Sequence, residues 1–342
     1  GVDSSLVAAI SKAELNDRAI QTFSVVFDDA KHAGLKSLSE LPYIRQVNEL
    51  FGCNEHLSRF DDAQVATALP EAIWHHELPL YSANTVLYLL HAKDIRERTT
   101  VLLSGEGSDD IFLGYFDGRE ISSDPADFMT TFVDADQLNS LFGQNGVERA
   151  FSNRRAIANS ERLNGMTHGQ RATAITVETV LHGLLGRHDR MFMSQSIEGR
   201  PPYCFDALIR ARFALPDEDV HSDKLGKRCV RKLAEQYFPN DFVYRKKQWL
   251  AGPWGRWCAD PSIWGQYFDT VNLQSLAQYI DPTCFENAMS VGDLRRKFQG
   301  KNLALIFAIL NFALWHQMYI EESNPCRASV WRDLAYPESV NS

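Results

Sequence analysis

The sequence predicts an α/β protein in which a doubly wound parallel sheet is followed by a mostly helical extension. Three short segments rich in β-branched, aromatic or aliphatic residues alternate with segments of helical periodicity, the order typical of a parallel sheet. These expected strands cover 22–27, 56–60 and 100–103. From about Tyr115 onward the periodicity is helical and strand signals are few, so the rest of the chain is predicted to form helices.

Local patterns place the helices between and after these strands. An apolar run at 6–10 begins the first helix, and apolar residues recur at helical spacing in later segments. These are 41–50, which Gly52 ends, 65–74, 86–90, 177–185, which Gly186 ends, and 303–318. The last is interrupted by Asn311, His316 and Gln317, so it is predicted to be buried rather than membrane-spanning. The polar segment 143–170 is expected to have the weakest order.

Composition narrows the class of protein and its partners. The 342 residues are 44% hydrophobic and 23% charged, which is typical of a soluble globular chain with a large core and two lobes. A net charge of −9 argues against non-specific binding to nucleic acid or to acidic membranes. The six cysteines are far apart and form no C-x-x-C pair, so we expect reduced thiols in a cytoplasmic protein.

An acidic loop with two glycines, 104–110, follows the third expected strand. The glycines let a ligand approach the backbone, Ser104 offers a hydroxyl, and Glu106, Asp109 and Asp110 offer carboxylates. Such a loop suits a site where Mg2+ lies between carboxylate and phosphate, since this ion prefers oxygen ligands. The alternative is an acidic turn that only caps the next helix.

A second candidate loop opens the chain. Gly1, Asp3, Ser4 and Ser5 lead directly into the first helix, and backbone N–H groups at a helix start bind phosphate readily. Asp3 adds another carboxylate for Mg2+. Because the carboxyl ends of parallel strands meet at one edge of a sheet, we expect the two loops to meet there.

Together these loops resemble those of the asparagine synthetase (glutamine-hydrolysing) family, in its C-terminal synthetase or ATP-pyrophosphatase domain. The family patterns are Ser-Gly-Gly-x-Asp-Ser and Ser-Gly-Glu-Gly-Ala/Ser-Asp-Glu. This chain begins at the second glycine, so the family's preceding serine, glycine and strand are missing. The resemblance implies an adenine nucleotide alpha hydrolase-like core over 1–116, with a mostly helical part, 117–342, that completes the active site.

Two further segments resemble the same family. Residues 189–203 resemble Asp-Arg-Met-Ser-Met-Ala-x-Ser-Leu-Glu-Val-Arg-Val-Pro-Phe, with Gly199 and Pro201 in place of valines. Their charged residues are expected to form scaffold ion pairs, Asp189 with Arg190 and Glu198 with Arg200. Residues 245–253 resemble Arg-Pro-Lys-x-Gly-Phe-x-x-Pro, which places Lys247 on the lysine that reaches the reacting phosphate.

The resemblance implies activation of a carboxylic acid by ATP through an acyl-adenylate, with release of pyrophosphate. Asp3 and Asp109 would hold Mg2+, and Lys247 would stabilise charge on the phosphorus. The implied nucleotide contacts are main-chain groups of Gly1, Ser4 and Ser5 to pyrophosphate, the backbone of Val25 to adenine, and Ser104 with Gly105 to the nucleotide.

Glu106 points to amidation. A carboxylate beside the adenylate can take the proton that ammonia must lose, and relatives that form β-lactams carry tyrosine at this position. Aspartate is the default acid by resemblance. The family's ammonia comes from glutamine through an N-terminal glutaminase, so we expect a removed domain or a separate subunit; a homodimer is a further expected assembly. Two alternatives stay open: a related ligase for another acid in secondary metabolism or glycan modification, and a non-catalytic homologue.

Overall fold

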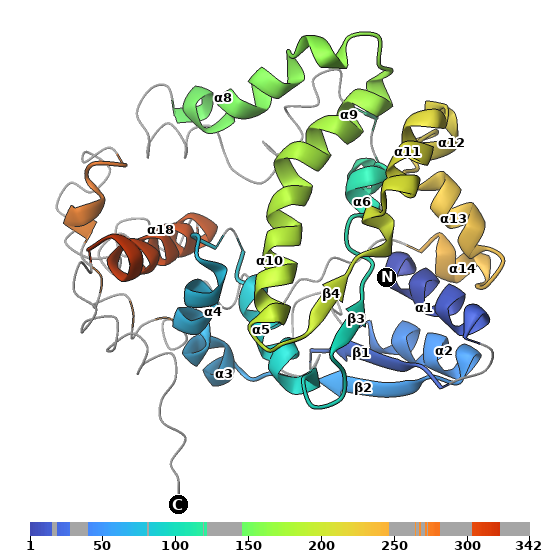
Figure 1. Ribbon diagram of the computed structural model, residues 1–342, viewed down its shortest axis with the longest axis horizontal. Helices are drawn as coiled ribbons and strands as arrows, with labels where there is room; N and C mark the ends of the chain where they lie inside the picture. The colour runs from blue at the N-terminus through green and yellow to red at the C-terminus, as the bar shows by residue number, and fades with distance from the viewer. Residues whose placement is uncertain are drawn as a thin grey trace, which may run out of the picture.

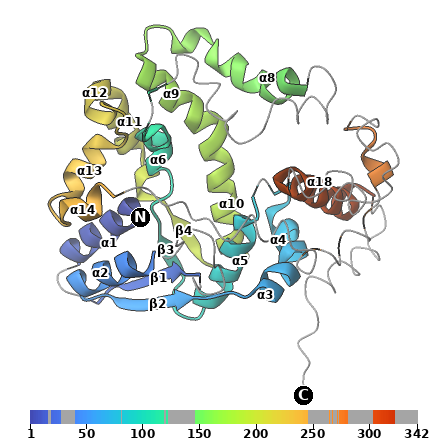
Figure 2. The ribbon, with the colours of Figure 1, turned by 180° about the vertical axis from the view of Figure 1, so that it is seen from behind.

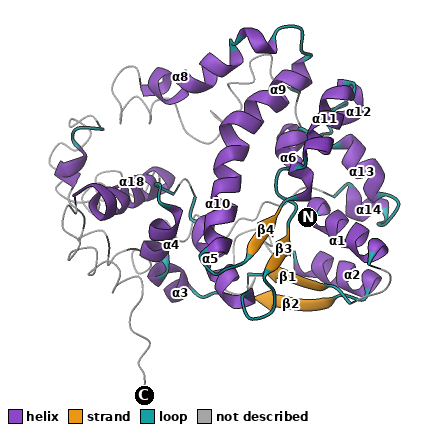
Figure 3. Cartoon of the chain, viewed as in Figure 1, coloured by secondary structure: helices purple, strands orange, loops and turns teal. Residues whose placement is uncertain are grey.

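The computed structural model describes residues 1–15, 19–27, 40–80, 82–118, 120–121, 146–245, 264, 267, 271, 273–280 and 303–321. The fold is mixed α/β and mostly helical in its described part, with one small parallel sheet, β3 and β4, near the centre of the view and another, β1 and β2, at its lower edge (Figures 1 and 3). The first half contains α1 Val2–Glu14, β1 Gln21–Val25, α2 Leu41–Phe51, β2 Asn54–Ser58, α3 Asp62–Thr67, α4 Leu69–His76, α5 Asn84–Ile95, β3 Val101–Leu103 and α6 Ser108–Ile111.

The described part of the second half is mostly helical. Its main elements are α8 Gly146–Ala158, α9 His168–Thr176, α10 His182–Met193, β4 Glu198–Arg200, α11 Asp206–Ala214, α12 Asp217–Val220, α13 Arg228–Ala234, α14 Asn240–Val243 and α18 Leu303–His316. A π-helical segment, Val177–Leu181, joins α9 to α10, and a second one, Gln317–Glu321, follows α18. The short 3-10 helices are Gly114–Phe116, Glu161–Leu163, Pro202–Cys204 and Leu273–Leu276.

The three predicted strands are confirmed, with bounds within two residues of those expected. β1 pairs in parallel with β2, from Gln21 opposite Asn54 to Val25 opposite Ser58. β3 pairs in parallel with β4. The strands of the described ranges therefore form two separate two-stranded sheets, and a single doubly wound sheet is not seen among them.

β4 was not predicted from the sequence. Its three residues, Glu198, Gly199 and Arg200, carry two charges and no β-branched side chain, so they have no strand signature. The strand forms because β3 offers it a parallel edge, with Val101 opposite Glu198. This pairing brings the helical extension against the strand that carries the acidic loop.

In the first half, the predicted end of the helix over 41–50 is confirmed, whereas a break inside the helix predicted over 65–74 was not foreseen. Gly52 ends α2 in the left-handed conformation at φ 59°, as its sequence predicts. The single helix expected over 65–74 is instead two helices, α3 and α4, which meet at Ala68. Pro70 lies in the first turn of α4, where its missing N–H costs no helical hydrogen bond.

Two predictions for the second half are wrong. Gly186 does not end its helix, because α10 continues to Met193 and buries Met191 and Phe192. Burial of two large side chains outweighs the roughly 1 kcal/mol that glycine costs inside a helix. The described part of the segment expected to be weakly ordered, 146–170, contains α8 and the capped start of α9, where Thr167 accepts a hydrogen bond from the backbone of Gln170.

The predicted burial of the last helix is confirmed. α18 packs against α4, and its Leu310 and Leu314 are fully buried. The polar Asn311 is satisfied inside the core: its amide bonds the backbone N–H and C=O of Leu80 at 2.5 and 2.6 Å. No helix in the described part of the chain is long and apolar enough to span a membrane.

Candidate active site

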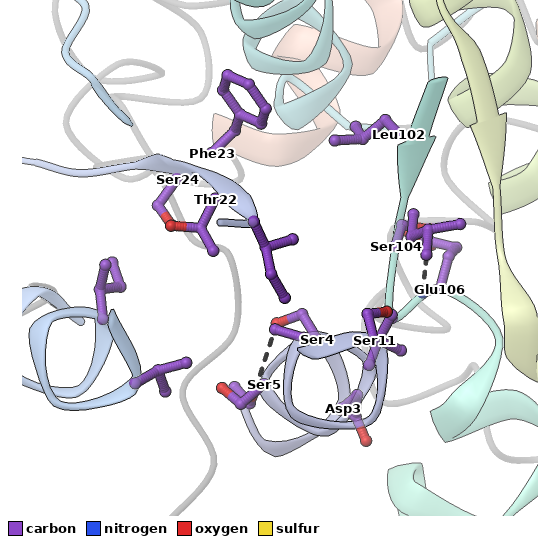
Figure 4. A pocket seen from close by; sticks show the side chains of 18 of the residues that line it. Asp3, Ser4, Ser5, Ser11, Thr22, Phe23, Ser24, Leu102, Ser104 and Glu106 are labelled. Atoms are coloured by element: carbon purple, nitrogen blue, oxygen red, sulfur yellow. Dashed lines mark hydrogen bonds between the residues drawn. The ribbon is translucent and has the colours of Figure 1, made fainter. Parts of the chain in front are cut away.

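A cavity of about 960 Å³ opens between β1 and β3, next to the N-terminal end of α1. Figure 4 shows Asp3, Ser4 and Ser5 on α1 below the opening, with Ser104 and Glu106 at the end of β3. Both candidate loops line this cavity. The lining includes all the predicted site residues that the structure describes: Gly1, Asp3, Ser4, Ser5, Val25, Ser104, Gly105, Glu106 and Asp109. Lys247 lies outside the described residues.

The two loops touch through Gly105. A Cβ atom at this glycine would lie only 2.6 Å from the backbone nitrogen of Ser4 and 3.0 Å from the backbone carbon of Asp3. No side chain larger than hydrogen fits between the loops without moving one of them. Glycine at position 105 is therefore what allows the contact.

We expect Gly105→Ala to separate the loops, which should weaken ATP binding and cost about 1–3 kcal/mol of stability through overpacking. Calorimetric ATP titration and thermal unfolding measure the two effects. Gly183→Ala is the matched control, because nothing lies within 4 Å of its Cβ position on α10. If both variants bind ATP equally, the loop contact has no part in nucleotide binding.

A buried lysine joins the carboxylates of the two loops. The ammonium of Lys227 lies 2.8 and 2.9 Å from the carboxylate oxygens of Asp3 and 2.9 Å from Oδ1 of Asp109. Ser108 also donates a hydrogen bond to Asp3, at 2.8 Å. The two acids predicted to share a cation therefore face a single positive charge.

Lys227 is held rigidly in this position. It precedes α13 with φ 56°, and its backbone N–H donates to the carbonyl of Phe112 at 2.9 Å. The residue is only 1% exposed. Burial alone would lower the pKa of the ammonium, but Asp3 and Asp109 outweigh burial and raise this pKa above its usual value.

Lys227 is a site residue that the sequence did not reveal. It lies 224 positions from Asp3 and belongs to a Gly-Lys-Arg stretch that resembles a solvated surface. Figures 1 and 2 show why it reaches the site: α13 lies beside α1 in both views. Only the tertiary packing of the extension identifies it.

The donor set at this point fits a magnesium ion. Asp3 and Asp109 supply charged oxygen ligands, and their side chains stay 16% and 20% exposed. The ammonium of Lys227 already bridges the carboxylates of Asp3 and Asp109, so this point of the site favours positive charge. Asp3 and Asp109 would be the residues that hold Mg2+, and the ion would share these carboxylates with the ammonium of Lys227.

Asp110 differs from its acidic neighbours. It is 1% exposed, and the hydroxyl of Tyr115 donates to it at 3.3 Å. Burial, with smaller contributions from the charges of Asp109 and Glu106, raises its pKa to about 7. Asp110 lines the cavity as Asp109 does, but it is more deeply buried, since the Asp109 side chain is 20% exposed.

Glu106 is bonded through both of its oxygens. Arg187 of α10 lies 3.1 Å from Oε1, and the hydroxyl of Tyr88 on α5 donates to Oε2 at 3.0 Å. The Glu106 side chain is 14% exposed. The carboxylate thus lies at the cavity wall in a fixed orientation, and neither partner was predicted from the sequence.

The predicted scaffold ion pairs have different outcomes. Glu198 and Arg200 form the expected pair, at 2.9 Å. Arg190 instead lies 3.6 Å from Glu77, and an Asp189–Arg190 pair is not found in the described ranges. Adjacent residues on a helix point in different directions, which explains the difference.

Comparisons with known proteins identify the family of this chain. A family profile described as asparagine synthase matches residues 1–317. The chain is 23% identical to glutamine-hydrolyzing asparagine synthetase 1 of Bacillus subtilis, over 94% of this chain and 55% of that protein. It is 25% identical to glutamine-hydrolyzing asparagine synthetase 3 of the same organism, over 72% and 43%.

A shorter part of the chain is similar to a fungal protein. It is 31% identical to amidase chyE of Penicillium rubens, over 28% of this chain and 14% of the fungal protein. The chain spans about half the length of the Bacillus relatives. The family profile covers most of the residues, including every element around the cavity. The chain belongs to the asparagine synthase family.

Proposed function

We propose that this chain catalyses ATP-dependent amidation of a carboxylic acid, with aspartate as the default acid. The observation that carries the proposal is that Asp3 and Asp109, one from each loop, both contact the ammonium of Lys227. Two loops with different signatures meet there, as binding of one nucleotide requires. A non-catalytic homologue has no chemical reason to keep this arrangement together with Glu106.

In the proposed first step, the substrate carboxylate attacks the α-phosphorus of ATP and pyrophosphate leaves. Main-chain groups of Gly1, Ser4 and Ser5 would bind the pyrophosphate, as expected at a helix start. Bound Mg2+, held by Asp3 and Asp109, would neutralise the charge that grows on the leaving group. AMP stays attached to the acid as an acyl-adenylate.

The other nucleotide contacts follow the cavity lining. The backbone of Val25 would contact adenine, while Ser104 and Gly105 would contact the nucleotide at the end of β3. The ammonium of Lys227 would add a fixed positive charge near the phosphates. Lys247, by resemblance, would approach the α-phosphorus, where one preorganised donor is worth roughly 3 kcal/mol.

In the proposed second step, ammonia attacks the acyl carbon. The C–N bond forms, the bond from carbon to the AMP oxygen breaks, and Glu106 takes a proton from the nitrogen. The nitrogen becomes acidic only once the C–N bond has formed, and the Glu106 carboxylate, held by Arg187 at the cavity wall, would take the proton at that point.

Glu106→Gln should still release pyrophosphate but lose amide formation by about 100-fold or more, since an amide accepts no proton. The two products are measured separately, with ammonium chloride as nitrogen donor. If both steps fall equally, Glu106 acts on the adenylation step instead.

Pyrophosphate exchange separates the candidate functions. The full-length protein would be incubated with ATP, Mg2+, labelled pyrophosphate and a panel of acids. Exchange that depends on aspartate supports the main proposal. Exchange that depends on another acid supports a ligase of secondary metabolism or glycan modification. No pyrophosphate exchange with any acid supports a non-catalytic homologue.

We also propose that β1 and β3 belong to one doubly wound sheet, joined by a strand between them. Both line the same cavity, and on β3 the apolar Val101 and Leu103 are 39% and 46% exposed. By resemblance, such a strand precedes Gly1. In a chain extended at its N-terminus, amide exchange at β1 and β3 should slow; unchanged exchange would contradict the joined sheet.

The remaining partners are proposals as well. Ammonia would come from glutamine through an N-terminal glutaminase domain or subunit, as the names of the Bacillus relatives suggest. The homodimer, the cytoplasmic location and the division into 1–116 and 117–342 stay predictions.

A further inference from the structure

Glu106 forms a closed ring of polar contacts with two other side chains, Arg187 and Tyr88. Arg187 and Tyr88 each bond one oxygen of the carboxylate, at 3.1 and 3.0 Å, and Arg187 also donates to the hydroxyl of Tyr88 at 3.1 Å. The guanidinium lies 4.2 Å from the centre of the Tyr88 ring. A glutamate side chain has three free torsions, and this ring of contacts restrains all of them.

The Tyr88 ring is held in turn by an aromatic cluster. It packs edge-on against His188 and Phe192, with ring centroids 6.1 and 6.0 Å away, and those two rings are 4.7 Å apart. Tyr88 comes from α5 and the other two from α10, and these helices pack along each other. The orientation of Glu106 therefore depends on the contact between two helices.

His188 fits this cluster because residue 199 has no side chain. A Cβ atom on Gly199 would lie 2.2 Å from Nε2 of His188. Neither ring nitrogen of His188 has a hydrogen-bond partner among the described residues, so the ring acts through packing. Burial, and secondarily the charge of Arg187, lowers its pKa to about 4, so the ring is neutral near pH 7.

We propose that Tyr88 and Arg187 are positioning residues that orient Glu106 toward the attacking amine, and that His188, seated on Gly199, holds Tyr88 in place. This inference rests on the proposed function. Two oxygens that each have one bond keep further lone pairs for the proton of the amine. Fixing them near the acyl carbon lets amidation outrun hydrolysis of the adenylate, because a misplaced base costs rate.

The test is the amount of amide formed per pyrophosphate released, with aspartate and ammonium chloride as substrates of the full-length protein. Tyr88→Phe keeps the ring and removes the hydroxyl, and it should lower this ratio about tenfold. The control Tyr267→Phe loses a 3.0 Å bond to the Ala66 carbonyl in the core and should leave the ratio unchanged. An unchanged ratio in Tyr88→Phe overturns the proposal.

His188 supplies a second arm. His188→Ala should lower the ratio, whereas His188→Phe should restore it, because phenylalanine keeps the ring contacts and no hydrogen bond of the described residues is lost. A merely structural role would change the unfolding midpoint without changing the ratio. Equal ratios in the alanine and phenylalanine variants would remove His188 from the network.

If no acid supports pyrophosphate release, the proposed function is wrong but the contact between Tyr88 and Glu106 can still be tested. A double-mutant cycle on thermal stability makes this test. Tyr88→Phe should lower the thermal unfolding midpoint more in the wild-type protein than in the Glu106→Ala variant. The hydrogen bond from Tyr88 to the carboxylate exists only in the wild-type protein. Equal shifts in both backgrounds show that Tyr88 does not hold Glu106 and overturn the inference.

Discussion

Replacing Lys227 by methionine should lower the free energy of unfolding by about 3–5 kcal/mol, the usual cost of removing one partner from a buried ion pair. Methionine keeps most of the volume, so the loss comes from charge. Without the ammonium, no positive charge at this point offsets the repulsion between the carboxylates of Asp3 and Asp109. Urea denaturation at neutral pH measures the change.

Lys232→Met is the matched control for this variant, because Lys232 is an exposed lysine on the same helix, α13. It should change stability by no more than about 0.5 kcal/mol. Adding Asp109→Asn to Lys227→Met should recover part of the loss by removing the repulsion. If Lys227→Met costs no more than Lys232→Met, the ammonium does not pair with these carboxylates in solution.

Asp109→Asn should reduce pyrophosphate release by at least about 100-fold, a loss comparable to that of a charged catalytic contact. Asparagine keeps the shape of the side chain but removes one of the two negative charges that face the cation. Both the rate of pyrophosphate release and its dependence on Mg2+ concentration should change.

A control for Asp109→Asn comes from an ion pair outside the cavity. Asp117 lies 2.8 Å from Arg231, so Asp117→Asn also breaks a buried pair but should leave the rate of pyrophosphate release within about twofold, since most substitutions outside a site act on stability alone. Near-normal turnover in Asp109→Asn would take this residue out of metal binding.

The site could be predicted where its signals are local. Glycine next to acids at the end of a strand marks the 104–110 loop, and glycine with serine at a helix start marks the first one. The cavity lining confirms that these loops meet. They meet although β1 and β3 belong to separate sheets among the described strands, because Gly105 lets the 104–110 loop approach the backbone of Asp3 and Ser4.

The missed residues are those that reach the site through long-range packing. Arg187 and Tyr88 come from helices and Lys227 from the residue just before α13, and charged and aromatic side chains are common at such positions and carry no motif. β4 was missed for the same reason, because three residues without strand propensity need a partner strand to form one. Gly186 misled because burial further along α10 decides where that helix ends.

The bridge from Asp3 to Lys227 has a consequence for the order in which this protein assembles during translation. During translation, Asp3 and Asp109 are both synthesised more than a hundred residues before Lys227. Until then their repulsion disfavours the finished pocket, and contacts of such high contact order form slowly. We therefore expect the two loops to take up their final arrangement only after the segment that carries Lys227 has folded against α1.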